Sequence, residues 1–174
     1  APGHKVQVRS RQSCAVSETG DLKCWGDSRW SSEPPKVKLV SFNGRCGITT
    51  KGEATCWGKD KSTWKTLEPK GTFSSVHSSG YGYACGLRPT GSVECWGSVQ
   101  DSNVDVPPEV AFKMISMESS YACGVTTAGK IECWGRESAG EYGQMSPPDG
   151  TYTSVSVSYR HACAVTTAGE IKCW

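Results

Sequence analysis

Cysteine is the chemically reactive residue type that this sequence places most regularly. The chain of 174 residues has 10 Cys, arranged as five pairs with nine residues between the two members of each pair. Paired Cys can form a disulfide or bind a metal ion. Structural zinc sites usually combine closely spaced two-Cys knuckles, and the sequence contains no Cys-x-x-Cys. The spacing therefore favours disulfides and predicts no metal site.

Each Cys pair bounds a segment whose pattern predicts a β-hairpin. In the first copy, Val16 and Leu22 alternate with polar residues, which is the period of a strand. Glu18-Thr19-Gly20 lies between them, with Gly where a three-residue loop needs positive φ. Pairing outward from this loop places Cys14 opposite Cys24 at a close pair, which suits a disulfide. The same count predicts the bridges Cys14–Cys24, Cys46–Cys56, Cys85–Cys95, Cys123–Cys133 and Cys163–Cys173.

The hairpin is the centre of a repeat that occurs five times. Each copy reads Cys, a small residue, an aliphatic, a turn with Gly at a fixed place, a mostly aliphatic position, a polar residue, Cys and Trp. A further short strand is expected before each hairpin, at 5–8, 36–40, 73–76, 112–117 and 152–157. We expect one domain over 1–174, with repeats at approximately 5–35, 36–71, 72–110, 111–150 and 151–174.

This repeat predicts an all-β fold of five small sheets. One three-stranded unit cannot bury both of its faces, and a repeat of this length is typical of propellers and solenoids. Radial stacking buries both faces of each sheet. Neither end has a degenerate capping unit, which favours a closed, five-bladed β-propeller with one disulfide in each blade. The repeated Trp residues are expected to pack between blades: Trp25, Trp57, Trp96, Trp134 and Trp174.

The number of bridges also indicates a compartment. Five disulfides require oxidising conditions. The sequence shows no apolar leader and no apolar run long enough for a membrane helix, and Ala1 fits the first residue after removal of a signal peptide. We therefore expect a secreted protein without a membrane span. A net charge of only +2 argues against nucleic acid as the partner.

Motifs for catalysis are not found in the sequence. It lacks a nucleophile elbow, a phosphate-binding loop and a zinc-protease helix. Of the three His, His77 and His161 stand shortly before the first Cys of a unit, where a polar strand-end role is the simpler interpretation. We expect no enzyme activity, no catalytic residues and no cofactor.

The last copy carries a resemblance to a known family. Its sequence, His-Ala-Cys-Ala-Val-Thr-Thr-Ala-Gly-Glu-Ile-Lys-Cys-Trp, resembles the repeat of the regulator of chromosome condensation family in its extracellular, Cys-containing form. The matching residues are His161, Val165, Gly169, Ile171 and Trp174, and in the third copy Leu87, Gly91, Val93, Trp96 and Gly97. The resemblance covers nearly the whole chain and implies a propeller. It departs from the family in two respects: the best-known members have seven blades, and the family's Gly-rich loop is kept only at 140–145.

The resemblance predicts the fold, but a shared fold does not determine the function. The family includes nucleotide-exchange factors, a β-lactamase inhibitor and extracellular receptor domains, and secretion disfavours the first of these. Five-bladed propellers are best represented among secreted sugar-binding proteins of the tachylectin type, which resemble this chain in architecture only.

Carbohydrate binding is the first functional hypothesis. Sugars stack on aromatic rings while polar side chains fix their hydroxyls, and the variable segments of this chain contain aromatic residues. The candidate ligand-binding residues are Trp30, Trp64, Tyr81, Tyr83, Tyr121, Tyr142, Tyr159, Arg160 and His161. For Tyr83 and Tyr121, packing at the start of a strand is the alternative. The expected partners are glycans or cell-surface glycoconjugates.

Protein binding is the alternative hypothesis, as in an enzyme inhibitor or a defence or toxin-like effector. The loops after each Trp-Gly differ in length and charge, and the loop at 59–65 sets Trp64 among Lys and Asp residues. Exposed aromatic residues with flanking charges are typical of protein interfaces. The segments before the first Cys differ too much for five equal sugar sites, and such variation fits one asymmetric partner.

Overall fold

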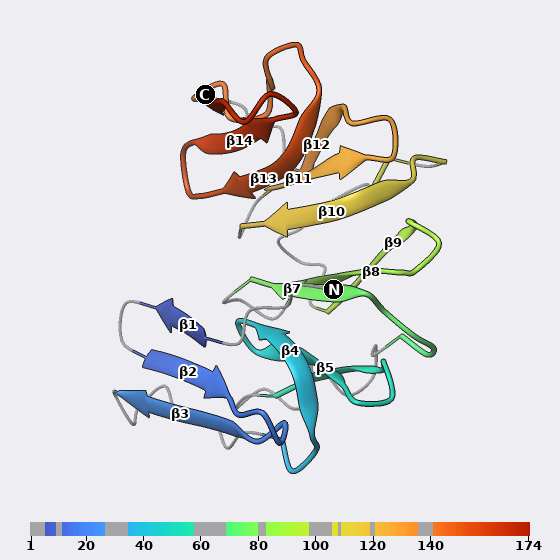
Figure 1. Ribbon diagram of the computed structural model, residues 1–174, viewed down its shortest axis with the longest axis vertical. Coiled ribbons are helices and arrows are strands. Elements are labelled where there is room, and N and C mark those ends of the chain that lie inside the picture. Colours follow the sequence, from blue (N-terminus) through green and yellow to red (C-terminus); the bar gives the residue numbers. More distant parts are fainter. Residues whose placement is uncertain are drawn as a thin grey trace.

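The described part of the chain consists of antiparallel sheets. The computed structural model describes residues 6–9, 12–26, 35–57, 69–79, 83–97, 106–107, 109–118, 121–135 and 141–174 (Figure 1). These residues form five three-stranded sheets and no helix, so none of the described segments is a helix able to span a membrane. The predicted all-β propeller architecture is confirmed.

The sheets, numbered blade one to blade five, follow the chain. In each blade the first strand pairs with the second and the second with the third. The strands are β1 Val6–Arg9, β2 Gln12–Val16 and β3 Leu22–Gly26; β4 Leu39–Asn43, β5 Cys46–Thr49 and β6 Ala54–Cys56; β7 Ser75–Ser78, β8 Tyr83–Leu87 and β9 Val93–Gly97; β10 Phe112–Met117, β11 Tyr121–Thr126 and β12 Ile131–Gly135; β13 Tyr152–Val157, β14 Ala162–Thr166 and β15 Ile171–Cys173. Residues of all five first strands line one central pocket.

The hairpin register is the one that the Cys spacing predicts. Cys14 pairs with Cys24 in the β2–β3 ladder, and the other four pairs occupy the same place in their blades. All five predicted disulfides are formed, with Cα atoms 4.0–4.1 Å apart. The Ser17 N–H donates to the Asp21 carbonyl at 3.0 Å and closes the loop. The loop glycine, Gly20, has a φ of 84°, which a residue with a Cβ rarely adopts.

The first strands agree with the prediction in two blades only. The bounds of β10 and β13 are those expected, whereas β1, β7 and β4 begin one, two and three residues later. In blade two, Leu39 pairs with Thr49 and Ser41 with Ile48. Val40 is thus the extra residue of a β-bulge, and half of its side chain is exposed. The alternation at 36–40 predicted the wrong bounds, because residues 36–38 precede the strand and Val37 is exposed. The same bulge occurs in β10 and β13, whose bounds are those expected.

The hydrophobic core lies between blades. Four clusters of buried residues each join two consecutive blades. In the cluster between blades four and five, Cys123, Val125 and Ile131 of blade four pack against Tyr152 and Ala164 of blade five. In each blade four residues form a surface that we call the cradle. They are the first Cys, the aliphatic residue two positions later, the turn Gly and the first residue of the third strand. The large residue that covers the cradle from the next blade is the wedge residue.

The wedge residues are Leu39, Phe73, Phe112 and Tyr152. Each donates its backbone N–H to the carbonyl of the turn Gly in the preceding blade, over 2.8 Å, and the four acceptors are Gly20, Gly52, Gly91 and Gly129. Close packing beneath the wedge also explains the Cys-Gly sequence of three copies. A Cβ at Gly124 would lie 2.4 Å from a ring carbon of Phe112, so a larger residue there would displace the ring.

The repeated Trp residues pack as predicted in the middle of the chain. Trp57, Trp96 and Trp134 are buried in the clusters between blades, and the rings of Phe112 and Trp134 are 5.1 Å apart. The expectation was wrong for Trp25, whose side chain is 56% exposed. Blade one is the first described blade, and no described residue covers this Trp as a preceding blade would.

Closure of the ring is not seen in the described residues. In Figure 1 blades one and five are the two ends of an arc. Val6 of blade one is 58% exposed and Ile171 of blade five is 74% exposed. A Cβ built on Gly169 meets no atom within 4 Å. Among the residues that the structure describes, blades five and one therefore do not form the junction that recurs between consecutive blades.

Candidate functional site

Four of the predicted ligand-binding residues gather on blade five. Tyr142, Tyr159, Arg160 and His161 are all exposed, on the segment before β13 and on the loop between β13 and β14. Three others, Trp30, Trp64 and Tyr81, lie outside the described residues.

Tyr83 and Tyr121 are located inside junctions between blades. Their side chains are 6% and 1% exposed, because each begins the middle strand of its blade and packs against the next blade. This differs from the expectation of a ligand-binding surface and agrees with the alternative of packing at a strand start. Burial raises the pKa of Tyr121 to about 12.

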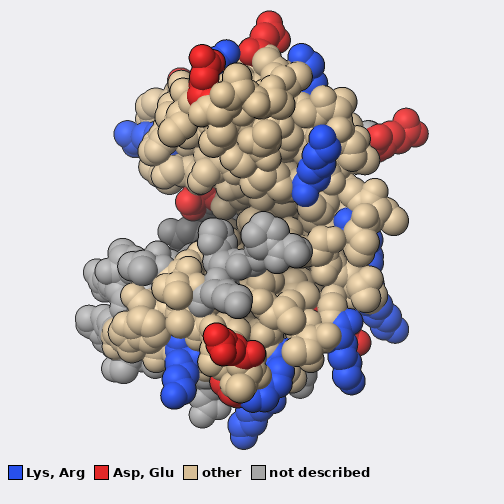
Figure 2. All heavy atoms as spheres, in the orientation of Figure 1, with Lys and Arg blue, Asp and Glu red and all other residues tan. Residues whose placement is uncertain are grey.

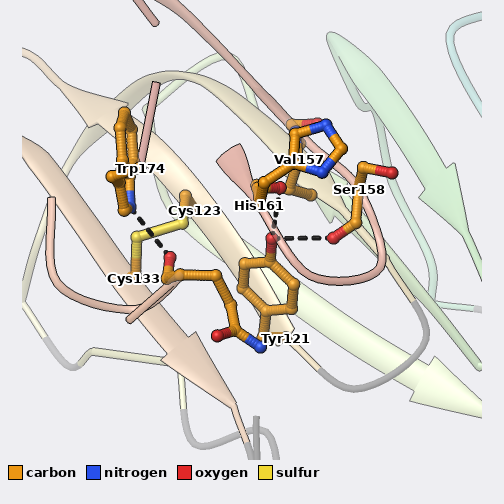
Figure 3. Close-up of a disulfide and its surroundings, with 9 residues drawn as sticks. Tyr121, Cys123, Cys133, Val157, Ser158, His161 and Trp174 are labelled. Carbon is orange, nitrogen blue, oxygen red and sulfur yellow. Dashed lines mark hydrogen bonds between the residues drawn. A yellow bond between two sulfur atoms is a disulfide. The ribbon is translucent and has the colours of Figure 1, made fainter. Parts of the chain in front are cut away.

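Tyr121 anchors the loop between β13 and β14. Its hydroxyl is within hydrogen-bonding distance of the carbonyls of Ser158, at 2.8 Å, and His161, at 2.9 Å (Figure 3). The Ser158 N–H also donates to the His161 carbonyl at 2.9 Å and closes the turn. The backbone of this loop is thereby fixed by a buried side chain of blade four, while the side chains of Tyr159 and Arg160 are left exposed.

A second anchor holds the segment with Tyr142. Gln144 is buried, and its side-chain Oε1 accepts a hydrogen bond from the Tyr142 N–H at 3.0 Å. The Gln144 carbonyl accepts another from the indole N–H of Trp174 at 3.0 Å, which Figure 3 shows beside the Cys123–Cys133 bridge. This segment includes part of the loop at 140–145, whose sequence resembles a Gly-rich loop. Sequence reasoning missed Gln144 as an anchor, because a single Gln in a loop carries no pattern.

The two anchored segments meet at Arg160. Its guanidinium carbon lies 4.6 Å from the ring centre of Tyr142 and 5.3 Å from that of Tyr159, which are cation–π distances. The two rings are 55% and 65% exposed. We call Tyr142, Tyr159 and Arg160 the Tyr–Arg surface; His161 follows it in the sequence and is also exposed. This surface combines two exposed aromatic rings with the guanidinium of Arg160, and such groups can bind a ligand.

A central pocket, which was not expected from the sequence, lies among the blades. It has a volume of about 760 Å³ and is lined mainly by the first strands, with His77 and Glu118 as its titratable groups. Within the described residues no group of three or more His, Cys, Asp and Glu is placed to hold a metal ion.

Comparison with known proteins identifies the fold. No family model matches the chain, and no curated protein matches it either. Among solved structures, the ectodomain of the receptor kinase CR4 from Physcomitrella patens superposes with a TM-score of 0.76 at 20% identity, over 94% of this chain and 49% of that chain. The CRINKLY WD40 ectodomain of the Arabidopsis thaliana receptor kinase ACR4 gives 0.73 at 20% identity, over 97% of this chain and 62% of that chain.

A third similar structure belongs to the family that the repeat resembles. Prp20p of Saccharomyces cerevisiae, reported with its binding properties to Gsp1p and histones, gives a TM-score of 0.69 at 15% identity, over 94% of this chain and 56% of that chain. This chain thus spans between about half and three fifths of the length of these neighbours. At such identities the likeness establishes the propeller fold and leaves the ligand to be inferred from the site.

Proposed function

We propose that the chain is an extracellular, non-catalytic binding domain that recognises a protein partner through the Tyr–Arg surface. The observation that supports this proposal is the exposed stack of Tyr142, Arg160 and Tyr159. The buried side chains of Tyr121 and Gln144 make hydrogen bonds to the backbone of the segments that carry this stack. A surface that is already ordered loses less conformational entropy when it binds.

The residue types favour a protein partner. Tyr and Arg are among the residues that dominate binding energy at protein interfaces. The Tyr–Arg surface is built from segments whose sequences differ from the equivalent segments of the other repeats, and a single site of this kind fits one asymmetric partner. Charged groups of both signs occur on the face in Figure 2, which also favours a protein over a nucleic acid.

An extracellular location is proposed from two observations. Five disulfides form in one chain, and such bridges persist in oxidising compartments. Two of the similar solved structures are ectodomains of plant receptor kinases. Binding in place of catalysis is proposed because the residues that converge at this surface supply contact area and hydrogen bonds.

The test is a parallel screen of the oxidised protein against an array of extracellular proteins and an array of glycans. Each hit is measured again with Arg160→Ala and Tyr159→Ala, and with Lys113→Ala, an exposed control on β10 of blade four. We expect a protein ligand whose binding weakens at least tenfold, as is usual for a hot-spot residue, in the first two variants and stays unchanged in the third. Protein binding that survives both substitutions would place the site elsewhere.

Carbohydrate binding is the second candidate, favoured by the exposed rings of Tyr142 and Tyr159, since sugars stack on such faces. In that case the glycan array gives a related group of hits. Tyr142→Ala abolishes their binding, whereas Tyr142→Phe retains it because the ring is preserved. A blank glycan array together with a protein hit rejects this candidate.

A further inference from the structure

The central pocket is bounded by the inner edges of the first strands. In the described sheets each first strand pairs with the second strand of its own blade only, so its other edge has no partner strand. Residues of β1, β4, β7, β10 and β13 line the pocket, whose volume of about 760 Å³ lies within the range of small-molecule sites. Consecutive blades pack through their faces. A further blade beside blade one or blade five would therefore leave these inner edges directed at the pocket.

Main-chain groups of β10 are directed at the pocket. The Glu118 N–H donates to the Tyr121 carbonyl at 2.9 Å, so the preceding residue directs its own N–H and C=O to the other edge of the strand. That residue is Met117, which lines the pocket. The equivalent residue of β13 is Val157, whose N–H donates to the Ser116 Oγ of β10 at 3.1 Å. The inner edges thus offer hydrogen-bonding groups, among them the Met117 carbonyl.

The charge of the pocket comes from Glu118. Among the described lining residues there is no Lys or Arg, and Glu118 is the only acidic residue. Its side chain is half-buried, so solvent screens its charge less than that of an exposed group. Arg45 and Arg160, on the turns at the same ends of their blades, are not among the lining residues. With His77 neutral, the described lining therefore carries one negative charge.

An apolar wall lies beside these polar groups. It consists of Ile115 and Val155, whose side chains are buried, and of Met114 and Met117, which are half-buried. Met side chains are flexible and adapt to ligands of different shape. An aliphatic chain that lies on this wall removes apolar surface from water on both partners. The pocket thus combines one negative charge, carbonyl acceptors and an apolar surface.

This combination matches the chemistry of a protonated amine on an aliphatic chain. An ammonium group has three donors and no acceptor, and its hydrogen bonds to a carboxylate are stronger than those between neutral groups. We propose that the central pocket is a second binding site, which takes an alkylammonium group at Glu118 and the Met117 carbonyl, with the attached chain along Met114 and Ile115. The lining residues on the face of blade five are not part of this site. It also uses no residue of the Tyr–Arg surface and so goes beyond the proposed function.

Three small probes of equal chain length test which end group the pocket prefers. Hexylamine, hexanol and hexanoate are titrated into the intact oxidised protein at a pH of about 8, where an unperturbed His is neutral. The readout is NMR of the Met methyl groups, because Met114 and Met117 line the pocket, whereas Met145, the third Met of the chain, does not. We expect hexylamine to shift both pocket signals and to leave that of Met145 in place. Hexanol should bind at least tenfold more weakly, and hexanoate more weakly still because Glu118 repels it.

A matched pair of variants locates the ammonium group. Glu118→Gln preserves the size of the side chain and removes its charge, so it should weaken hexylamine binding at least tenfold and leave hexanol binding unchanged. Glu132→Gln makes the same change at an exposed residue of β12 outside the pocket and should alter neither. Unchanged Met methyl signals in the free Glu118→Gln protein establish that it is folded. The comparison of hexylamine with hexanol in the wild type does not depend on any variant.

Two sources of the same chemistry are distinguished with N-acetyl-lysine amide. Tighter binding of this probe than of hexylamine assigns the pocket to a Lys side chain of a partner, and weaker binding assigns it to a free amine. The proposal is overturned by absence of shifts at Met114 and Met117, by equal affinity for hexylamine and hexanol, or by unchanged affinity in Glu118→Gln. Equal shifts at Met145 would indicate non-specific adsorption and would also reject it. None of these titrations tests the Tyr–Arg surface, so failure of this proposal and failure of the proposed function are distinguishable.

Discussion

The cradles of blades four and five are nearly the same sequence in two different environments. Val125 is fully buried and Val165 is half-buried, although both occupy the same place in a Cys-stapled hairpin. The difference arises from the next blade, whose wedge residue covers the first cradle only. Burial in this fold is thus a property of junctions, and equal residues in equal hairpins are expected to contribute unequally to stability.

The largest contrast is expected between a wedge residue and an uncovered cradle residue. Phe112 is buried against Trp134, and its ring lies over Gly124, so Phe112→Ala should lower the free energy of unfolding by about 3–5 kcal/mol. Ile171→Ala should change it by less than about 0.5 kcal/mol, because Ile171 is exposed. Urea unfolding followed by Trp fluorescence measures both, and similar losses would refute the contrast.

Removal of a disulfide is expected to have the next largest effect. Every bridge closes a loop of the same sequence separation, 10 residues, so the loss of chain entropy is the same, about 2–3 kcal/mol. Cys123→Ala with Cys133→Ala should cost about 1–2 kcal/mol more than Cys163→Ala with Cys173→Ala, because Cys123 is fully buried and its truncation leaves a cavity. Thermal unfolding of the two double variants tests this, and equal losses would argue against it.

The turn glycines give a smaller contrast with the same backbone conformation. Gly91 and Gly169 have φ values of 91° and 86°, so Ala at either position costs about 1–2 kcal/mol of strain. At Gly91 the new Cβ would also lie 3.1 Å from the Phe112 carbonyl oxygen. Gly91→Ala is therefore expected to destabilise by about 1 kcal/mol more than Gly169→Ala, as chemical denaturation would reveal. A greater loss at Gly169 would mean that something covers this turn in solution.

An effect confined to alkaline solution concerns the junction of blades four and five. The pKa of Tyr121 is raised by burial to about 12 in the folded protein, above the value of about 10 in an unfolded chain. The folded state therefore binds the phenol proton more tightly. This contribution to stability is complete below pH of about 10 and is lost as the pH rises from about 10 to about 12. Ultraviolet titration should detect a late-ionising phenol that Tyr121→Phe removes.

Local structure was predictable from the sequence because the repeat fixes it. The nine-residue Cys spacing and the glycine position determine the hairpin register, and both depend on neighbours within one hairpin. The bounds of β4 were missed because the alternation placed Val37 in the strand, whereas the strand begins at the wedge residue Leu39, which packs against another blade. The exposure of Trp25 was missed for the same reason.

The candidate site was predictable in part. Aromatic and cationic residues outside the repeat pattern pointed to Tyr142, Tyr159 and Arg160, which the structure places together. The same signal also selected Tyr83 and Tyr121, because the sequence pattern does not distinguish a buried aromatic residue at the start of a strand from an exposed one. The hydroxyl of Tyr121 contacts residues 37 and 40 positions away, and a contact at this separation leaves no periodic signal.

The confinement of each disulfide to one hairpin has a consequence for biosynthesis. The two Cys of a bridge are 10 residues apart, so they meet within a short loop as soon as that stretch of chain is extended into an oxidising compartment. Correct pairing requires no information from later repeats. Oxidation can therefore proceed one hairpin at a time in the order of synthesis, and mispaired isomers should be rare even though the chain carries 10 Cys.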